Sequence, residues 1–166
     1  MQRIFIGLGS NVGDRISHMR SAVRALRGMP GVEVRTCSSA YETEPVGDIV
    51  QPDFLNAAVE VRSDLTPPEM LKRLKETELR VGRTPGERWG QREIDLDLLF
   101  VGDLVVTGER MKVPHPEARN RKFVLIPLAE IASSFPDPLT GRRISDLLQS
   151  CTDTKRVTRI SESIDV

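Results

Sequence analysis

The sequence has no excess of charge of either sign. Its 166 residues include 24 basic and 24 acidic side chains, so the formal net charge at pH 7 is +0. Proteins whose main task is to bind nucleic acids or membrane surfaces usually carry a clear basic excess. The balance therefore argues against both kinds of partner, while it leaves room for charged groups of opposite sign to cluster locally.

Cysteines and long apolar runs are also scarce. The two cysteines, Cys37 and Cys151, lie far apart and form no CxxC pair, which is more typical of idle thiols than of a disulfide or a metal site. No apolar run approaches the roughly 18 residues that a membrane span needs. The first residues contain no basic region followed by a long apolar stretch, so no secretory signal is visible. We expect a soluble, cytoplasmic protein.

What is present suits one small globular domain. A chain of 166 residues with 39% hydrophobic side chains can bury a core of its own. We expect a single domain over residues 1–150. Residues 151–166 are polar with weak periodicity, and we expect them to form a loose tail.

Hydrophobic periodicity predicts strands and helices in a defined order. The clearest helix start is at Thr66, because Pro67 suits the first helical position and Glu69 can complete a capping box. The expected elements are strands over residues 3–8, 32–43, 54–62 and 93–101, with helices from about Asp14 to Gly28 and from Pro67 to Gly82. The segments 44–53 and 83–92 are rich in proline, glycine or arginine and are expected to be long loops.

This order is strand-helix-strand-strand-helix-strand, which is the split βαβ arrangement. It predicts an α+β, ferredoxin-like βαββαβ core with an antiparallel sheet and helices on one face. Beyond the core, residues 104–106 and 111–113 can pair as a small hairpin, and short helices are expected near 123–131 and 144–149.

Two aspartates mark the centre of the predicted chemistry. Asp95 and Asp97 lie two residues apart on a strand, so both point to one face, roughly 7 Å apart, and Glu93 shares that face. Neighbouring carboxylates in a partly dry setting repel each other and need a cation. Magnesium prefers such oxygen ligands and commonly adds substrate phosphates to one or two carboxylates. The alternative is an aspartate pair that is solvated or paired with arginines.

Basic residues gather on both sides of this strand. Arginine binds phosphate oxygens through two parallel hydrogen bonds, so a polyphosphate with bound magnesium satisfies the acids and the bases at once. The simpler alternative is that the arginines only neutralise the carboxylates. The residues are Arg83, Arg88 and Arg92 before the strand and Arg110, Lys112, His115, Arg119 and Arg121 after it.

Two other features were weighed for ligand binding. The glycine-rich stretch 7–14 lacks the third glycine of GxGxxG and the Gly-Lys-Ser/Thr ending of a P-loop, so a tight turn into a helix explains its glycines. Phe54, Asn56 and Trp89 suit a flat heterocycle through stacking and edge hydrogen bonds. The alternative for them is core packing by Phe54 and surface anchoring by Trp89.

Taken together, these residues resemble the 6-hydroxymethyl-7,8-dihydropterin pyrophosphokinase family. The resemblance spans nearly the whole chain, from IGLGSN at the start to PLAEIA near residue 130. Its most specific parts are the ordered motifs QPDFLNAAV around Asn56, ERWGQR over 87–92 leading into Asp95-Leu96-Asp97, Val113-Pro114-His115, and Arg121 with Phe123.

The resemblance implies a ferredoxin-like core crossed by a groove, and transfer of pyrophosphate from ATP to the pterin in folate biosynthesis, releasing AMP. It implies two Mg²⁺ ions on Asp95 and Asp97, with Arg83 and Arg92 as further catalytic residues and no obvious general base. The implied ATP contacts are Arg83, Arg92, Arg110, Lys112, His115 and Arg121. The implied pterin contacts are Thr43, Val46, Phe54, Asn56, Trp89 and Phe123.

The sequence departs from the family pattern at a few positions. Lys75 and Lys112 replace neutral polar residues, Pro116 replaces an aromatic residue, and Phe54 replaces a frequent tyrosine. The first three affect the expected nucleotide contacts and leave the reaction class unchanged. Two rival classes were considered, a ligand-sensing module without catalysis and a metal-dependent nuclease. The expected partners are small molecules only, with no nucleic acid and no membrane, and the expected state is a monomer.

Overall fold

The protein is described here from a computed structural model that covers residues 1–86, 88 and 90–166. Its larger elements follow the predicted order. The strands are β1 (Gln2–Ser10), β2 (Val32–Cys37), β3 (Tyr41–Thr43), β4 (Phe54–Ser63), β5 (Asp95–Val101), β6 (Val106–Thr107), β7 (Lys112–Val113) and β8 (Val157–Arg159). The helices are α1 (Arg15–Arg27), α2 (Pro67–Val81), α3 (Lys122–Ala132) and α4 (Ile144–Gln149).

The main sheet is antiparallel, with neighbours in the order β5-β1-β4-β3-β8 and with β2 paired to the other half of β4. Strand β4 therefore separates β1 from β2, which is the split βαβ arrangement. The prediction of an α+β, ferredoxin-like fold is confirmed. The expected small hairpin is also present, because β6 pairs with β7.

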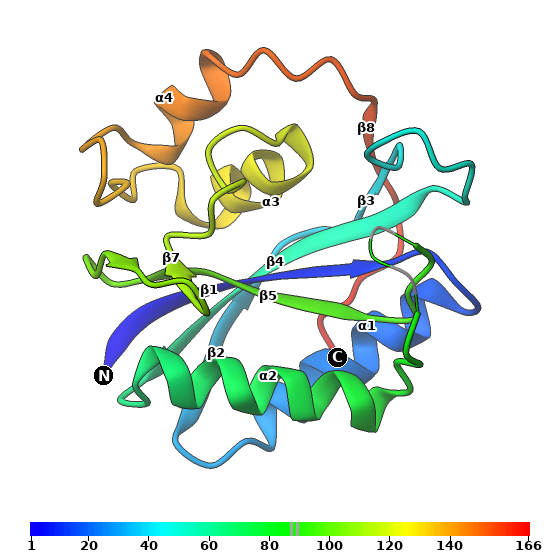
Figure 1. Cartoon of the computed structure of the whole chain (residues 1–166), viewed down its shortest axis with the longest axis horizontal. Coiled ribbons are helices and arrows are strands. Elements are labelled where there is room, and N and C mark those ends of the chain that lie inside the picture. Colours follow the sequence, from blue (N-terminus) through cyan, green and yellow to red (C-terminus); the bar gives the residue numbers. More distant parts are fainter. Residues whose placement is uncertain (87, 89) are drawn as a thin grey trace.

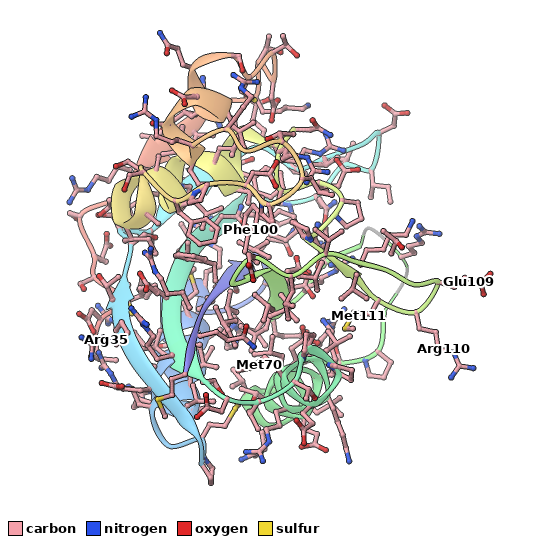
Figure 2. All side chains as sticks on the ribbon, turned by 90° about the vertical axis from the view of Figure 1, so that its left-hand side faces the viewer. Arg35, Met70, Phe100, Glu109, Arg110 and Met111 are labelled. Carbon is pink, nitrogen blue, oxygen red and sulfur yellow. The ribbon has the colours of Figure 1, made fainter. Side chains whose placement is uncertain are left out.

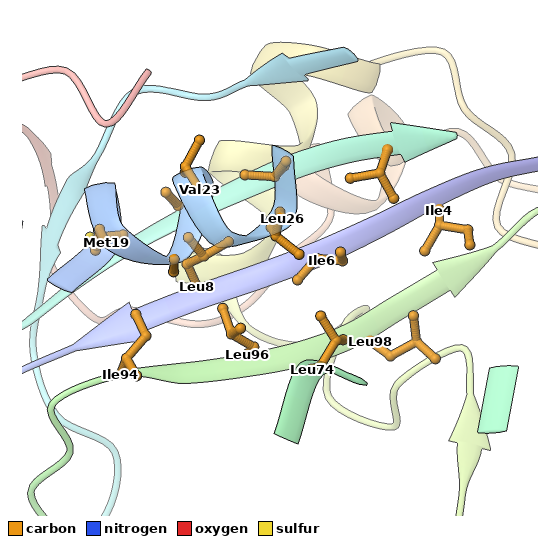
Figure 3. Close-up of a cluster of buried hydrophobic side chains, with 14 of the residues drawn as sticks. Ile4, Ile6, Leu8, Met19, Val23, Leu26, Leu74, Ile94, Leu96 and Leu98 are labelled. Carbon is orange, nitrogen blue, oxygen red and sulfur yellow. The ribbon is translucent and has the colours of Figure 1, made fainter. Parts of the chain in front are cut away.

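Helices cover both faces of the sheet (Figure 1). On one face α1 and α2 enclose the larger core, in which Ile6 and Leu8 of β1 meet Leu26 of α1 and Leu74 of α2 (Figure 3). On the other face α3 and α4 cover a smaller cluster. Figure 2 shows Phe100 in this second layer. We expected helices on one face of the core, and the two short C-terminal helices supply the second layer.

Local sequence signals account for the helix starts. The side chain of Asp14 accepts a hydrogen bond from the backbone N–H of Ser17 (3.1 Å) and so caps α1. The capping box of α2 forms as predicted, with Thr66 N–H donating to Glu69 Oε2 (2.8 Å). These caps satisfy backbone groups that the first helical turn leaves unpaired.

Two strand boundaries differ from the prediction. The strand expected over residues 32–43 is divided into β2 and β3, because Ser38 turns its hydroxyl to receive the N–H of Ala58 (2.9 Å). Strand β5 begins at Asp95, and Glu93 instead accepts hydrogen bonds from Thr84 (2.7 and 3.1 Å). Glu93 therefore does not belong to the face that carries Asp95 and Asp97.

The C-terminal segment is attached more firmly than expected. Residues 157–159 form β8, which extends the sheet by pairing with β3. Ile164 is fully buried against the larger core, and Ile160 packs beside it. The expectation of a loose tail was therefore wrong, while the division of the chain at residue 150 stays a prediction. Among the helices in the described residues, none has the length and apolar character needed to span a membrane.

Candidate active site

A cavity of about 300 Å³ opens on the face of the sheet that α3 covers only in part. It collects predicted residues from five separate segments of the chain. Those that line it are Thr43, Val46, Phe54, Asn56, Arg92, Asp95, Asp97, His115, Arg121 and Phe123. Arg88, one of the basic residues singled out in the sequence, also lines it, as do Glu44, Gln51, Gly90, Leu99, Glu117 and Val124.

Strand register explains why the acidic and amide side chains share this cavity. Gly9 of β1 lies opposite Asn56 of β4 on one side and opposite Asp95 of β5 on the other. Gly7 is likewise flanked by Asp97. Because strands are about 4.8 Å apart, Asn56 and Asp95 stand roughly 10 Å apart on one face with a glycine between them.

The two glycines keep the floor of the cavity open. A Cβ added at Gly9 would lie 3.0 Å from Asn56 Oδ1, and one at Gly7 would lie 3.3 Å from a Leu99 methyl group. Both residues lie inside β1. The interpretation of these glycines as parts of a tight turn was therefore wrong, because their role is to let side chains of the neighbouring strands approach over the sheet.

Asp95 is surrounded by cations. Its carboxylate accepts hydrogen bonds from Arg92 Nη1 (2.6 Å) and Arg83 Nη1 (2.9 Å), and Lys75 Nζ lies 3.8 Å away. Burial alone would raise the pKa of Asp95, but the charges of Arg92, Lys75 and Arg83 outweigh it and hold that pKa below its ordinary value. Asp95 is therefore ionised and fixes the two guanidinium groups at the cavity.

Asp97 has the opposite environment. Within residues 1–86, 88 and 90–166, no hydrogen bond or ion pair reaches its carboxylate. Burial raises its pKa, and the nearby charge of Asp95 raises it further, while His115 and Lys75 oppose this only in part. An ionised Asp97 would therefore gain from a further cation beside the partial help that His115 and Lys75 give.

Asp95 and Asp97 are the acidic side chains of β5 that line the cavity. In the described part of the chain, no group of three or more His, Cys, Asp or Glu side chains gathers as a metal site. A divalent cation at Asp95 and Asp97 would therefore need further oxygens from a ligand. This combination suits Mg²⁺, which typically uses one or two carboxylates together with phosphate oxygens.

A buried glutamate that the sequence analysis did not single out positions the cations. Glu78 of α2 is only 3% exposed and forms ion pairs with Lys75 (2.7 Å) and with Arg83. It also accepts a hydrogen bond from the backbone N–H of Leu96 (2.7 Å), the residue between the two aspartates. In the sequence, Glu78 lies three residues after Lys75 on the same helix, a spacing that allows an ion pair. Its contacts with Arg83 and Leu96 become visible only when α2 packs against β5.

Asn11 links the two loops that border the cavity. Its side chain donates to Gln51 Oε1 and to Pro52 O (3.0 Å each), and it accepts from the backbone N–H of Arg92 (2.8 Å). The backbone N–H of Asn11 also donates to Arg92 O (3.0 Å). This residue, 2% exposed, was likewise missed, because its partners lie about forty and eighty positions away.

His115 and Arg121 are oriented by one acidic residue. The N–H of Glu117 donates to His115 Nδ1 (3.2 Å), and the Glu117 carboxylate accepts from Arg121 Nε (3.0 Å). A neutral imidazole that accepts at Nδ1 carries its proton on Nε2. His115 can therefore present an N–H donor while Arg121 presents its terminal nitrogens.

The amide of Asn56 is oriented as well. Its Nδ2 donates to the hydroxyl of Thr43 (2.6 Å), so its Oδ1 is the atom that faces the space over Gly9. Among the described residues none donates to Oδ1. Asn56 therefore offers a hydrogen-bond acceptor to a ligand, because its contact with Thr43 turns Oδ1, and not Nδ2, toward the cavity.

The remaining predicted residues lie elsewhere. Arg83 contacts Asp95 from the rim, and Lys112 is exposed on β7. Arg110 is exposed near the tip of the β6–β7 hairpin, pointing away from the body (Figure 2). It borders a second, largely apolar cavity of about 610 Å³ lined also by Leu71, Lys75 and Met111. Trp89 lies outside the described residues.

Comparison with known proteins shows which family the chain resembles. A model of the family described as 7,8-dihydro-6-hydroxymethylpterin-pyrophosphokinase matches residues 5–133. The 2-amino-4-hydroxy-6-hydroxymethyldihydropteridine pyrophosphokinase of Bacillus subtilis is 46% identical over 137 residues, which are 82% of this chain and 82% of that protein. The enzyme of the same name from Haemophilus influenzae is 35% identical over 153 residues, 92% of this chain and 95% of that protein.

A solved structure shares the fold. The Plasmodium falciparum HPPK-DHPS protein superimposes with a TM-score of 0.73 at 14% sequence identity, covering 89% of this chain and 44% of that chain. The chain thus spans less than half of that longer protein. The fold and the sequence matches together define an enzyme that transfers pyrophosphate. The chain belongs to the 7,8-dihydro-6-hydroxymethylpterin-pyrophosphokinase family.

Proposed function

We propose that the cavity over Gly9 is the site where pyrophosphate passes from ATP to the pterin. Membership of the family gives the overall reaction, in which ATP and 6-hydroxymethyl-7,8-dihydropterin yield the pterin diphosphate and AMP in folate biosynthesis. The observation that carries the assignment of the site is the row Asn56, Gly9 and Asp95 across β4, β1 and β5. It puts an amide suited to a heterocycle within about 10 Å of a carboxylate suited to a metal-bound phosphate.

Two Mg²⁺ ions are proposed at Asp95 and Asp97. The residues fit such a group, because Asp97 is an acidic side chain without a cationic partner in the described chain and Asp95 stands beside it on the same strand. Bound magnesium would neutralise phosphate charge and polarise the phosphorus that is attacked. We further propose Arg83, Arg92, Asp95 and Asp97 as the catalytic group.

Arginines and His115 would bind the triphosphate. Arg92 and Arg121 line the cavity with terminal nitrogens available to phosphate oxygens, and His115 offers its Nε2–H. The second, apolar cavity lies beside Lys75, which also approaches Asp95, so it suits the nucleoside of the same ATP. Arg110 and Lys112 of the hairpin are proposed to contact the nucleotide from that side.

The pterin would occupy the other part of the cavity. Phe54 and Phe123 offer ring faces for stacking, and Asn56 Oδ1 offers an acceptor for the N–H groups of the heterocycle. Thr43, Val46 and Trp89 complete the proposed set. The hydroxymethyl oxygen would form a bond to the β-phosphorus, and the bond from that phosphorus to the oxygen of the α-phosphate would break as AMP leaves. We assign no general base.

A mass-spectrometric assay for AMP tests the proposed site. Wild type should form AMP and the pterin diphosphate only when ATP, the pterin and magnesium are all present. Asp97→Ala should abolish turnover with an unchanged circular dichroism spectrum. Asp103→Asn removes one charge from an exposed position just after β5 and should behave as wild type.

Other outcomes separate the rival functions. Pterin binding without AMP would indicate a sensing module, and cleavage of nucleic acid without the pterin would indicate a nuclease. Near-wild-type turnover in Asp97→Ala and in Asp95→Ala would contradict the metal site. A monomer acting in the cytoplasm stays our proposal, and light scattering after size-exclusion chromatography tests the first part of it.

A further inference from the structure

The segment that leads into β8 forms hydrogen bonds with both ends of the loop over residues 44–53. The backbone N–H of Arg156 donates to Glu44 Oε1 (2.8 Å), and the N–H of Glu44 donates to the Arg156 carbonyl oxygen (3.4 Å). The Arg156 guanidinium then donates to Asp53 Oδ2 (2.9 Å). One residue thus joins the first and last parts of the loop, which lie nine positions apart in sequence.

A second arginine holds the same end of the loop from the opposite side. Arg15, the first residue of α1, donates to the Asp53 carbonyl oxygen (2.9 Å) and to Glu42 Oε1 (3.0 Å). Asp53 therefore accepts a hydrogen bond from Arg15 at its main-chain oxygen and one from Arg156 at its side chain. Figure 1 shows β8 running beside β3 and the loop that follows β3.

The body of the loop has little packing of its own. Val50 is 99% exposed and Ile49 is 45% exposed. A space of about 410 Å³ lies beside the loop, lined by its own residues and by Arg156. With so few apolar contacts, the position of the loop depends on how its ends are held.

The same loop forms a wall of the candidate active site. Val46 and Gln51 line the cavity, and Thr43 immediately before the loop orients Asn56. These residues stand on the side proposed for the pterin, whereas Asp95, Asp97 and Arg92 come from β5 and the segment before it. A shift of the loop ends would therefore change the pterin wall directly, whereas it would reach Arg92 only indirectly, through the hydrogen bonds of Asn11 to Gln51, Pro52 and Arg92.

We propose that Arg156 is a positioning residue for the pterin. Its main chain pairs with Glu44, and its guanidinium donates to Asp53 and so holds the last part of the loop 44–53 against the cavity. The identity of that ligand rests on the proposed function, whereas the fastening of the loop by the C-terminal segment is independent of it. Arg156 touches no substrate in this account, and its effect passes through the loop.

The test compares Arg156→Ala with two matched variants. Lys155→Ala removes the neighbouring positive charge without altering the contacts to Glu44 and Asp53. Arg156→Lys keeps the charge but places it on a single nitrogen at the end of a shorter side chain. A half-exposed ion pair contributes modestly, so we expect the KM for the pterin to rise about two- to fivefold in Arg156→Ala. The kcat and the KM for ATP should stay within about twofold of wild type, and Arg156→Lys should recover part of the loss.

Direct binding adds a readout that does not depend on turnover. Calorimetry with the pterin, in the presence of magnesium and a non-hydrolysable ATP analogue, should show the same weakening in Arg156→Ala. Asp53→Ala should weaken binding as much, and the double variant should add nothing further, because both changes break one contact.

Three results would overturn this inference. They are an unchanged pterin KM in Arg156→Ala, an equal loss for ATP and the pterin, and the same loss in Lys155→Ala. A wild-type enzyme that forms no AMP would instead refute the proposed function. The two failures can be distinguished because loop attachment can be measured without turnover. Limited proteolysis near Asp48 with a protease specific for acidic residues should be faster in Arg156→Ala than in wild type if the loop is held less firmly.

Discussion

Replacing Asp97 by asparagine should stabilise the ligand-free protein while it removes activity. The carboxylate is partly buried beside Asp95, and the charges of His115 and Lys75 offset the repulsion only in part. Asparagine has nearly the same shape and carries no charge. The variant therefore removes a repulsion that the proposed binding of metal and phosphates would explain.

The size of the effect follows from the strand geometry. Two unit charges about 7 Å apart, as expected for residues i and i+2 of a strand, repel by about 2.4 kcal/mol at an effective dielectric constant of about 20. Arg83 and Arg92 already offset part of the Asp95 charge. We therefore expect Asp97→Asn to gain about 1–2 kcal/mol at pH 7, or roughly 2–8 °C in Tm for a chain of this size.

Thermal unfolding at several pH values provides the assay and its control. Because the pKa of Asp97 is raised in the folded state, the unfolded chain ionises first and wild type loses stability as the pH rises through the folded pKa. The two proteins should converge at low pH, where the residue is protonated in both states. Asp95 has a lowered pKa, so Asp95→Asn should instead be less stable at neutral pH, with its deficit shrinking as the pH falls. An unchanged or lower Tm for Asp97→Asn at pH 7 would refute this account of the site.

Three further substitutions test the neighbouring groups. Glu78→Ala should cost about 1–3 kcal/mol of unfolding free energy by denaturant titration, because it breaks the ion pairs with Lys75 and Arg83 and leaves the backbone N–H of Leu96 without its acceptor, and a cost below about 0.5 kcal/mol would contradict this. Arg92→Lys should remain impaired in kcat, since lysine keeps the charge and loses the two-point contact, whereas full recovery would show that charge alone matters. Asn56→Ala should weaken pterin binding by about 1–3 kcal/mol in calorimetry and spare magnesium-ATP, and equal losses for both ligands would refute its assignment.

The core of the fold was predictable because its signals are local. Helix α2 begins with a proline and a capping box and ends at Gly82, and β4 alternates between its two faces over ten residues. Such signals require no knowledge of distant parts of the chain. The C-terminal strand β8 was missed because three residues of mostly polar character have no period of their own and are specified by their pairing with β3.

The candidate site was predictable as a set of residue types and much less as a geometry. Asp95 and Asp97 were found from their spacing, and their arginine neighbours from sequence proximity. The sequence gives no sign that Gly9 would stand between Asn56 and Asp95, because that row depends on the register of three strands. Asn11 and Glu78 were missed for the same reason, since each connects segments that meet only after folding.

The different surroundings of the two aspartates imply an exchange of partners on binding. Arg92 donates to Asp95 at 2.6 Å, while no arginine among the described residues donates to Asp97. A guanidinium that binds phosphate through two nitrogens must give up part of its contact with a carboxylate. Magnesium at the aspartate pair would replace the charge that Asp95 then loses and would supply the charge that Asp97 lacks. Under the proposed function, Asp95 would keep the arginines ordered until a metal-bound triphosphate arrives, and Asp97 would make the arrival of the metal favourable. Glu78 does not line the cavity and contacts Arg83 throughout, so it can hold that arginine in place while the pairing around Asp95 changes.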